Sequence, residues 1–151
     1  GRAALLRIEL QFVFRNPPDE DLRDLLARAK TVAVVGLSPR PERPSHRIAQ
    51  RLQSWGYRVV PVRPAVNEVL GEKAYPRLAD VPDKIDLVDV FRSAEEVEPI
   101  VDQCIALGLP AIWIQLGIVN EPAAARARAA GMVVVMDLCI SVEYRRLLVP
   151  A

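Results

Sequence analysis

The sequence has few of the residues that build metal centres and no excess of either charge. It contains two cysteines and one histidine in 151 residues. A Cys₂His₂ or Cys₄ zinc site is nearly excluded by that count, because every candidate ligand would have to converge. Lysine plus arginine number 20 and aspartate plus glutamate 19. Such a balance gives no reason to expect nucleic acid or an anionic membrane surface as a partner.

Long hydrophobic runs are also missing. No stretch approaches 18 consecutive apolar residues, so no transmembrane helix is predicted. Residues 1–18 carry Arg2, Arg7, Glu9 and Arg15, whereas a signal peptide needs an uninterrupted apolar stretch. A cytoplasmic setting with reduced thiols is therefore the expectation. An apolar fraction of 51% beside 26% charged residues predicts a globular core.

What the chain does have is a regular alternation of two patterns. Short apolar, mostly β-branched runs are typical of parallel strands buried on both faces; they lie at 31–36, 57–62, 85–90, 110–115 and 132–136. Segments with helical spacing lie between them, at 45–56, 94–108 and 121–130, with others at 20–29 and 141–147. This predicts an α/β, Rossmann-like, doubly wound fold. We expect a five-stranded, mainly parallel sheet of order 3-2-1-4-5 with helices on both faces, in one domain (19–151) after an N-terminal extension (1–18).

Ligands of doubly wound folds bind beyond the carboxyl ends of the strands, and the loop after the first strand is the most informative here. Gly36 permits a tight turn, and Ser45 is placed to cap the next helix, whose N-terminus attracts phosphate. The loop is not a dinucleotide fingerprint, because Ser38 and Pro41 stand where glycines are required. A phosphate here would depend on side chains, and arginine forks suit its oxygens.

The end of the second strand carries Arg63-Pro64. An NAD enzyme would place an acidic residue there to hold the ribose. A cation at this point instead suggests an extra phosphate on the ribose. NADP carries one on the 2′ oxygen and coenzyme A (CoA) carries one on the 3′ oxygen, and Arg63 alone does not separate them.

Five motifs occur in order along the chain: GLSPRPERPS, VLG, DVFR, QLG and MDLC. With them, residues 31–147 resemble the small stand-alone CoA-binding proteins, which are single-domain relatives of the CoA-binding domain of succinyl-CoA synthetase α subunits. The resemblance implies a Rossmann-like fold, CoA or an acyl-CoA as the ligand, and no known catalytic reaction. With the strand-end rule, it predicts these binding residues: Gly36, Ser38, Pro39, Arg40, Arg43, Ser45, Arg63, Pro64, Phe91, Arg92, Gln115 and Gly117.

The sequence thus predicts a CoA-binding protein without catalytic or metal-ligating residues. Two alternatives stay open: an NADP-dependent oxidoreductase, and a regulatory module that senses CoA and reports to a protein partner. No Ser–His–Asp arrangement or Walker loop is visible.

Five further side chains have a structural interpretation beside a functional one. His46 is interpreted as a polar surface residue or a minor phosphate contact. Cys104 falls on an apolar helix stripe and is expected in the core. Cys139 follows the last strand on the ligand side, where a mixed disulfide with CoA is conceivable, although a structural thiol is the preferred interpretation. Asp86 and Asp89 point to opposite faces of their strand, so structural pairing is expected for them.

Overall fold

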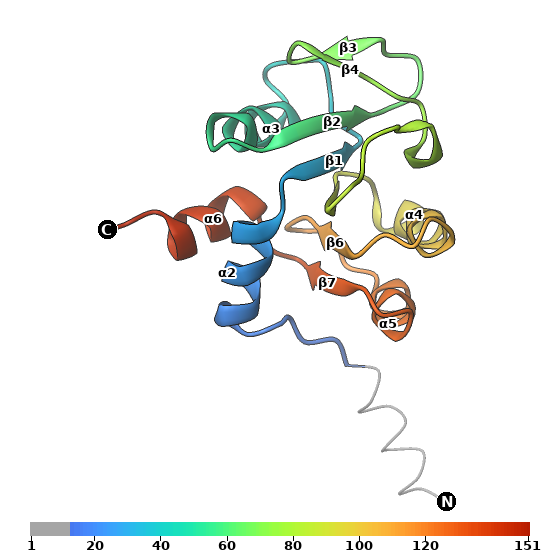
Figure 1. The fold of residues 1–151 in the computed structure, drawn as a ribbon. Coiled ribbons are helices and arrows are strands. Elements are labelled where there is room, and N and C mark those ends of the chain that lie inside the picture. Colours follow the sequence, from blue (N-terminus) through green and yellow to red (C-terminus); the bar gives the residue numbers. More distant parts are fainter. Residues whose placement is uncertain (1–12) are drawn as a thin grey trace, which may run out of the picture.

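The computed structural model describes residues 13–151, so residues 1–12 of the predicted extension lie outside the described part (Figure 1). The helices and strands follow the predicted alternation closely. Their bounds are α2 (Asp19–Arg28), β1 (Thr31–Val35), α3 (Pro44–Ser54), β2 (Arg58–Val62), β3 (Glu68–Val69), β4 (Glu72–Lys73), a 3₁₀ turn (Leu78–Asp80), β5 (Leu87–Val90), α4 (Ala94–Ala106), β6 (Ala111–Ile114), α5 (Glu121–Ala129), β7 (Val133–Met136) and α6 (Ile140–Leu148).

Five parallel strands form the main sheet, as predicted, but their order differs from the prediction. The observed order is β2-β1-β5-β6-β7, which is 2-1-3-4-5 along the chain. The third predicted strand therefore pairs with the first strand and not with the second, and the order 3-2-1-4-5 is wrong.

The residues after β2 explain this order. The chain forms the small β3–β4 hairpin and then bonds to the outer edge of β2 through Tyr75. The N–H of Arg63 donates to the carbonyl of Tyr75 (2.8 Å), and the N–H of Tyr75 donates to that of Pro61 (2.9 Å). Because this edge is occupied, the next strand pairs on the free side of β1.

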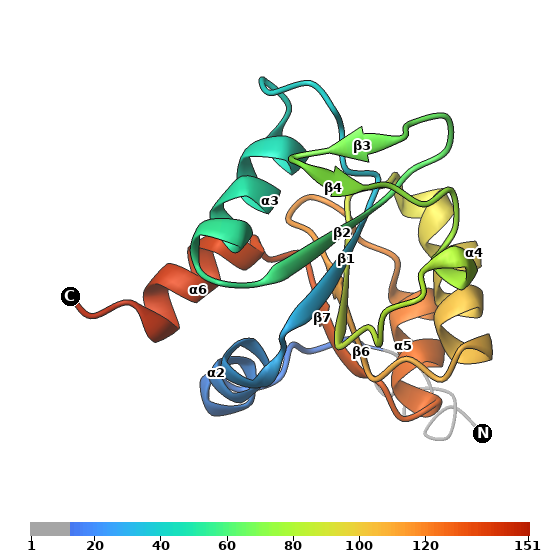
Figure 2. The ribbon, with the colours of Figure 1, turned by 45° about the horizontal axis from the view of Figure 1, so that its top comes forward.

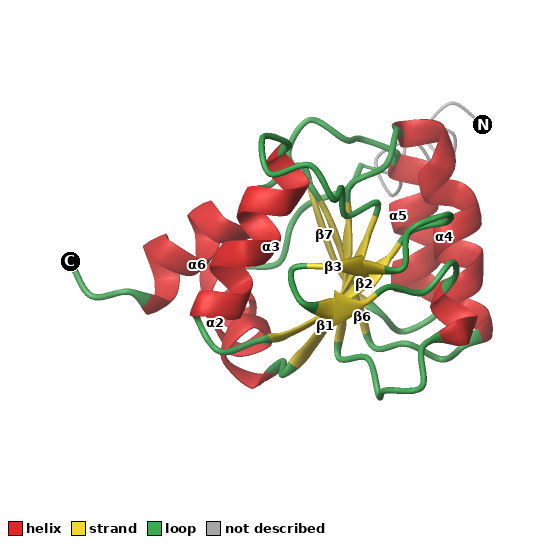
Figure 3. Ribbon diagram, turned by 90° about the horizontal axis from the view of Figure 1, so that it is seen from above, coloured by secondary structure: helices red, strands yellow, loops and turns green. Residues whose placement is uncertain are grey.

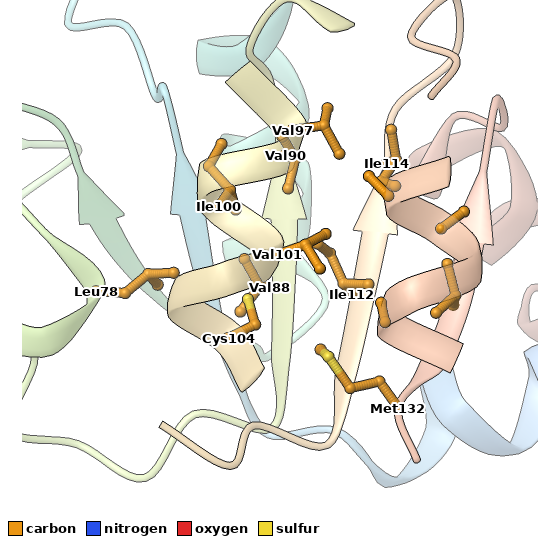
Figure 4. Packing of buried hydrophobic residues seen from close by; sticks show 14 of the residues in the cluster. Leu78, Val88, Val90, Val97, Ile100, Val101, Cys104, Ile112, Ile114 and Met132 are labelled. Carbon is orange, nitrogen blue, oxygen red and sulfur yellow. The ribbon is translucent and has the colours of Figure 1, made fainter. Parts of the chain in front are cut away.

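Helices cover both faces of the sheet (Figure 3). On one face α4 and α5 pack against apolar side chains that include Val88, Val90 and Ile112, and Cys104 lies among them fully buried, as predicted (Figure 4). On the other face α2, α3 and α6 cover Leu87 and Trp113. Burying both faces is what makes the strands read as continuous apolar runs.

The described end of the predicted extension packs on the domain. The Asn16 side chain exchanges two hydrogen bonds of 2.8 Å with the backbone of Met136, and the Arg128 guanidinium lies 4.4 Å from the centre of the Phe14 ring. In the described residues 13–151, no helix is long and apolar enough to cross a membrane.

Candidate functional site

A cleft of about 780 Å³ lies at the carboxyl ends of the strands. Gly36 at the end of β1 and Phe91 at the end of β5 both line it. The chain winds from β1 to β2 in one direction and from β5 through β6 to β7 in the other. The cleft is thus at the switch point, where doubly wound folds bind ligands. The β1–α3 loop forms one of its walls, near the upper edge of Figure 2.

Most of the predicted binding residues line this cleft. Eight of the twelve do so: Gly36, Ser38, Arg40, Arg43, Ser45, Arg63, Phe91 and Arg92. Among the other four, Pro64 lines an adjoining smaller cleft with Gly36 and Arg92, and Pro39 is an exposed loop residue.

Gln115 and Gly117 hold the ends of β6 and β7 together and do not line the cleft. The buried Gln115 side chain accepts a hydrogen bond from the N–H of Ile140 (3.2 Å), and the N–H of Gly117 donates to the Asp137 carboxylate (2.8 Å).

The β1–α3 loop is fixed by its serines. The Ser38 N–H donates to the Ser45 hydroxyl (3.0 Å), and the Arg40 N–H donates to the Ser38 hydroxyl (3.1 Å). Ser45 is therefore not the helix cap that the sequence suggested. Arg43 holds the cap position without a side-chain hydrogen bond, and Pro44 is the first helical residue, a position where a missing N–H costs nothing.

His46 differs from its predicted surface position. It is buried, and its Nδ1 lies 3.0 Å from the Ser38 carbonyl oxygen. The backbone N–H groups of His46 and Arg47 both donate to the Arg43 carbonyl. In the first turn of α3, the backbone N–H of Ser45 therefore has no hydrogen bond among the described residues. The His46 ring thus supports the β1–α3 loop. With a single free N–H in this turn of the described chain, phosphate binding by the loop would depend mainly on its side chains.

Arginines dominate the charge of the cleft. Four guanidinium groups line it, from Arg40, Arg43, Arg63 and Arg92, and none of its lining residues is acidic. Arg40 and Arg43 are exposed and make no salt bridge within the part of the chain that the structure describes. This arrangement of exposed forks at one end of the sheet is suited to phosphate oxygens.

The other two arginines have partners. Arg92 forms a fork with Glu96 (2.7 Å from Nη2 to Oε1), and this hydrogen bond raises the pKa of the guanidinium. Arg63 donates from Nη1 to the Gly36 carbonyl (3.3 Å). Within the described residues it forms no surface ion pair with Glu68, an acidic residue nearby in the sequence. Arg63 therefore fastens the end of β2 to the turn after β1 while lining the cleft.

Three lining residues lay outside the predicted set: Pro44, Ser93 and Ile118. Ser93 directly follows Arg92 and holds the N-cap position of α4 without a side-chain cap hydrogen bond. The strand-end rule that selects Phe91 and Arg92 also covers it. Ile118 has no comparable sequence signal, because it lies in an irregular turn after β6.

Asp86, which directly precedes β5, and Asp89, which lies within it, differ in their hydrogen bonding. Asp86 accepts hydrogen bonds from the N–H groups of Lys30 and Thr31 (3.0 and 2.9 Å), which confirms a structural role. Asp89 is completely buried, and neither carboxyl oxygen has a hydrogen-bond partner among the described residues, so the expected pairing is wrong. Burial, and next the charge of the Cys139 sulfur, raise the pKa of Asp89 well above its ordinary value.

A second cleft of about 710 Å³ lies at the amino ends of the strands. Three aspartates and three arginines are among its lining residues: Asp21, Asp24, Asp86, Arg15, Arg28 and Arg128. Its mixed charge gives it no preference for an anion. No group of three or more metal-ligating side chains occurs within residues 13–151.

Comparison with known proteins agrees with this architecture. The family model for a CoA-binding domain matches residues 30–145. The uncharacterised protein YneT of Bacillus subtilis is 39% identical over 130 residues, which cover 86% of this chain and 96% of YneT. A hypothetical protein from Pyrococcus horikoshii has a solved structure with 40% identity and a TM-score of 0.85, covering 90% of this chain and 98% of that one.

A multidomain enzyme contains a similar segment. The ADP-forming acetate–CoA ligase II of Archaeoglobus fulgidus is 32% identical over 104 residues, which are 67% of this chain but 15% of the ligase. The match to the family model covers most of the chain, and the stand-alone relatives match it nearly end to end. The chain therefore belongs to the family of CoA-binding domains.

Proposed function

We propose that the protein binds CoA or an acyl-CoA in the cleft between β1 and β5, and that it has no catalytic apparatus of its own. The observation that carries this proposal is the cleft itself: four arginines and no acid, at the switch point of a fold whose family binds CoA. CoA has a diphosphate and a 3′-phosphate, so it offers three phosphate groups to guanidinium forks.

Two parts of the cleft suit two parts of the ligand. The Ser38–Ser45 hydrogen bond holds the loop that carries Arg40 and Arg43, and this side suits the phosphates. Phe91 and Ile118 supply apolar surface on the other side, which suits the less polar pantetheine arm. Gln115 and Gly117 would act indirectly, by holding the strand ends that carry this wall.

The absence of a catalytic role is inferred from the side chains at the cleft. The histidine ring is buried against the Ser38 carbonyl, and serine is the one nucleophile type lining the cleft. Three serines line the cleft. Ser38 and Ser45 have no general base beside them within the hydrogen bonds of residues 13–151. Ser93 lies beside the Glu96 carboxylate, but the Arg92 fork lowers the pKa of that carboxyl and so makes it a weak base.

Titration calorimetry of the folded protein with CoA tests the proposal. We expect saturable heat with CoA at micromolar concentrations. NADPH should bind much more weakly, because Ser38 and Pro41 stand where a dinucleotide-binding loop requires glycines. No heat with CoA would refute the function, and tighter binding of NADPH would favour the oxidoreductase instead.

Arg43→Ala should weaken CoA binding by about 1.5–3 kcal/mol, because it removes a charge-assisted contact to phosphate. Arg51→Ala is the matched control, since Arg51 is exposed in the last turn of the same helix. Calorimetry of both variants measures the effect. An unchanged dissociation constant for Arg43→Ala, or an equal loss in Arg51→Ala, would remove Arg43 from the site.

A further inference from the structure

Cys139 lies at the carboxyl end of the sheet, half-buried, at the residue that precedes α6. Its sulfur is 3.2 Å from the Ser141 hydroxyl. Burial opposes ionisation of the thiol, but the Ser141 hydroxyl, the backbone N–H groups of Val142 and Ser141, and the Gln115 side chain outweigh it and lower the pKa of Cys139. Cys139 holds the N-cap position of α6 without a side-chain hydrogen bond to the backbone of the helix.

The other cysteine provides a contrast within the same chain. Cys104 is fully buried in α4, and burial raises the pKa of its thiol to about 12. A thiolate is the nucleophile in thiol–disulfide exchange, so burial disfavours exchange at Cys104, whereas Cys139 is only half-buried.

Asp89 is an independent indication that the region around Cys139 has a function besides packing. Val88 and Val90 point to the α4–α5 face, so Asp89, between them, points to the face where Cys139 lies. Asp89 is opposite Trp113 in β6, and the Trp113 indole donates to the carbonyl of Leu138, the residue before Cys139 (2.8 Å). A buried carboxyl with no hydrogen-bond partner among the described residues, on the same face as a half-buried thiol, is typical of functional sites.

The same face connects Cys139 with the proposed CoA cleft. Phe91 follows Asp89 by two positions and therefore points the same way, about 7 Å further along the strand. Phe91 lines the cleft, and Phe91 and Cys139 both pack against the apolar cluster on this face of the sheet. The thiol is thus on the same face as the apolar wall that suits the pantetheine arm, whose end carries the sulfhydryl of CoA.

We propose that Cys139 is a thiol–disulfide exchange site that forms a mixed disulfide with CoA, a role that rests on the proposed CoA binding. The Cys139 thiolate attacks one sulfur of CoA disulfide, a protein–CoA S–S bond forms, and the original S–S bond breaks. The second CoA leaves as a thiolate and takes a proton from water. No oxidant is needed, because CoA disulfide supplies the oxidising equivalents. The reverse reaction with a thiol restores Cys139.

The test uses the reduced full chain, CoA disulfide without oxygen, and intact-mass spectrometry with peptide mapping. We expect one adduct on Cys139, with a mass gain of CoA less two hydrogens, which dithiothreitol removes. Exchange with CoA disulfide should be at least ~10-fold faster than with 2-hydroxyethyl disulfide, because binding positions the reacting sulfur. Cys139→Ser should give no adduct, and Cys104→Ala should still give it. Mapping of the unaltered chain decides the site even if a variant fails to fold.

Calorimetry with CoA on Cys139→Ser separates the two proposals. Three outcomes would overturn the exchange site alone if CoA still binds. They are no adduct on the unaltered chain, an adduct on Cys104, and equal rates of exchange with the two disulfides. No CoA binding by either protein, together with equal rates, overturns the proposed function and the exchange site with it.

Discussion

Gly36→Ala is expected to destabilise the protein by about 3 kcal/mol and to weaken CoA binding at least tenfold. Gly36 has a φ of +85°, where an L side chain is strained. A Cβ there would lie 2.5 Å from the Phe91 carbonyl oxygen and 2.8 Å from Cδ of Arg92. The Phe91 carbonyl cannot retreat easily, because the Phe91 N–H is bonded to Val35 (2.9 Å). The added methyl would therefore push apart the two strand ends that line the cleft.

Urea unfolding measures the stability change, and calorimetry below the unfolding range measures CoA affinity. Gly131→Ala is the matched control, because Gly131 has a φ of +93° but no atom within 4 Å of the added Cβ. This control should lose about 1 kcal/mol, the strain of positive φ alone, and should bind CoA normally. Equal losses in both variants would show that the close approach of β1 and β5 contributes nothing.

Asp89→Asn is expected to stabilise the protein by about 2 kcal/mol at pH 8. Asp89 is completely buried without a hydrogen-bond partner among the described residues, and its pKa is raised in the folded state. Asparagine has nearly the same shape and no ionisation, and its amide shares the lack of partners with the neutral carboxyl. The substitution therefore removes mainly the cost of keeping Asp89 protonated or burying its charge.

The pH dependence gives this prediction its sign. Below the unfolded pKa of 3.8 the carboxyl is protonated in both states and costs nothing. As the pH rises above that value, the unfolded chain releases the proton while the folded chain retains it, so the folded state loses about 1.4 kcal/mol per pH unit until the folded pKa is reached. The advantage of Asp89→Asn should thus be near zero at pH 4 and large at pH 8.

Urea unfolding of both proteins at several pH values checks it. Asp86→Asn is the control, because the Asp86 carboxylate accepts two backbone N–H groups and its loss should not stabilise the protein. If Asp89→Asn were no more stable than the unaltered chain at pH 8, the carboxyl would have a partner in solution that offsets its burial.

Local patterns predicted the helices and strands well, because the spacing of apolar residues within each element reflects which of its faces is buried. Runs such as residues 31–36 and 110–115 became β1 and β6, and helical spacing marked α3 and α4 within a few residues. The strand-end rule needs these local assignments and the chain direction, but not the strand order. Eight of the residues that it selected therefore line the cleft, although the predicted order was wrong.

The failures occurred where a contact joins distant parts of the chain. Nothing near residue 75 in the sequence shows that Tyr75 occupies the outer edge of β2 and so directs β5 to β1. Ser45 has the chemistry of a helix cap, but the hydroxyl is used by the Ser38 N–H. His46 looks like a surface residue until the loop folds over it.

By itself, the sequence determined the fold class, the end of the sheet where the cleft lies, and the arginine-rich character of that end. These properties follow from apolar periodicity and from residue types beside strand ends, which are local. Only the tertiary structure decided the strand order, the close approach of Gly36 to Phe91, and the burial of Asp89 without a partner on the same face as Cys139. These depend on which strands become neighbours, and that choice is made by the packing of the whole chain.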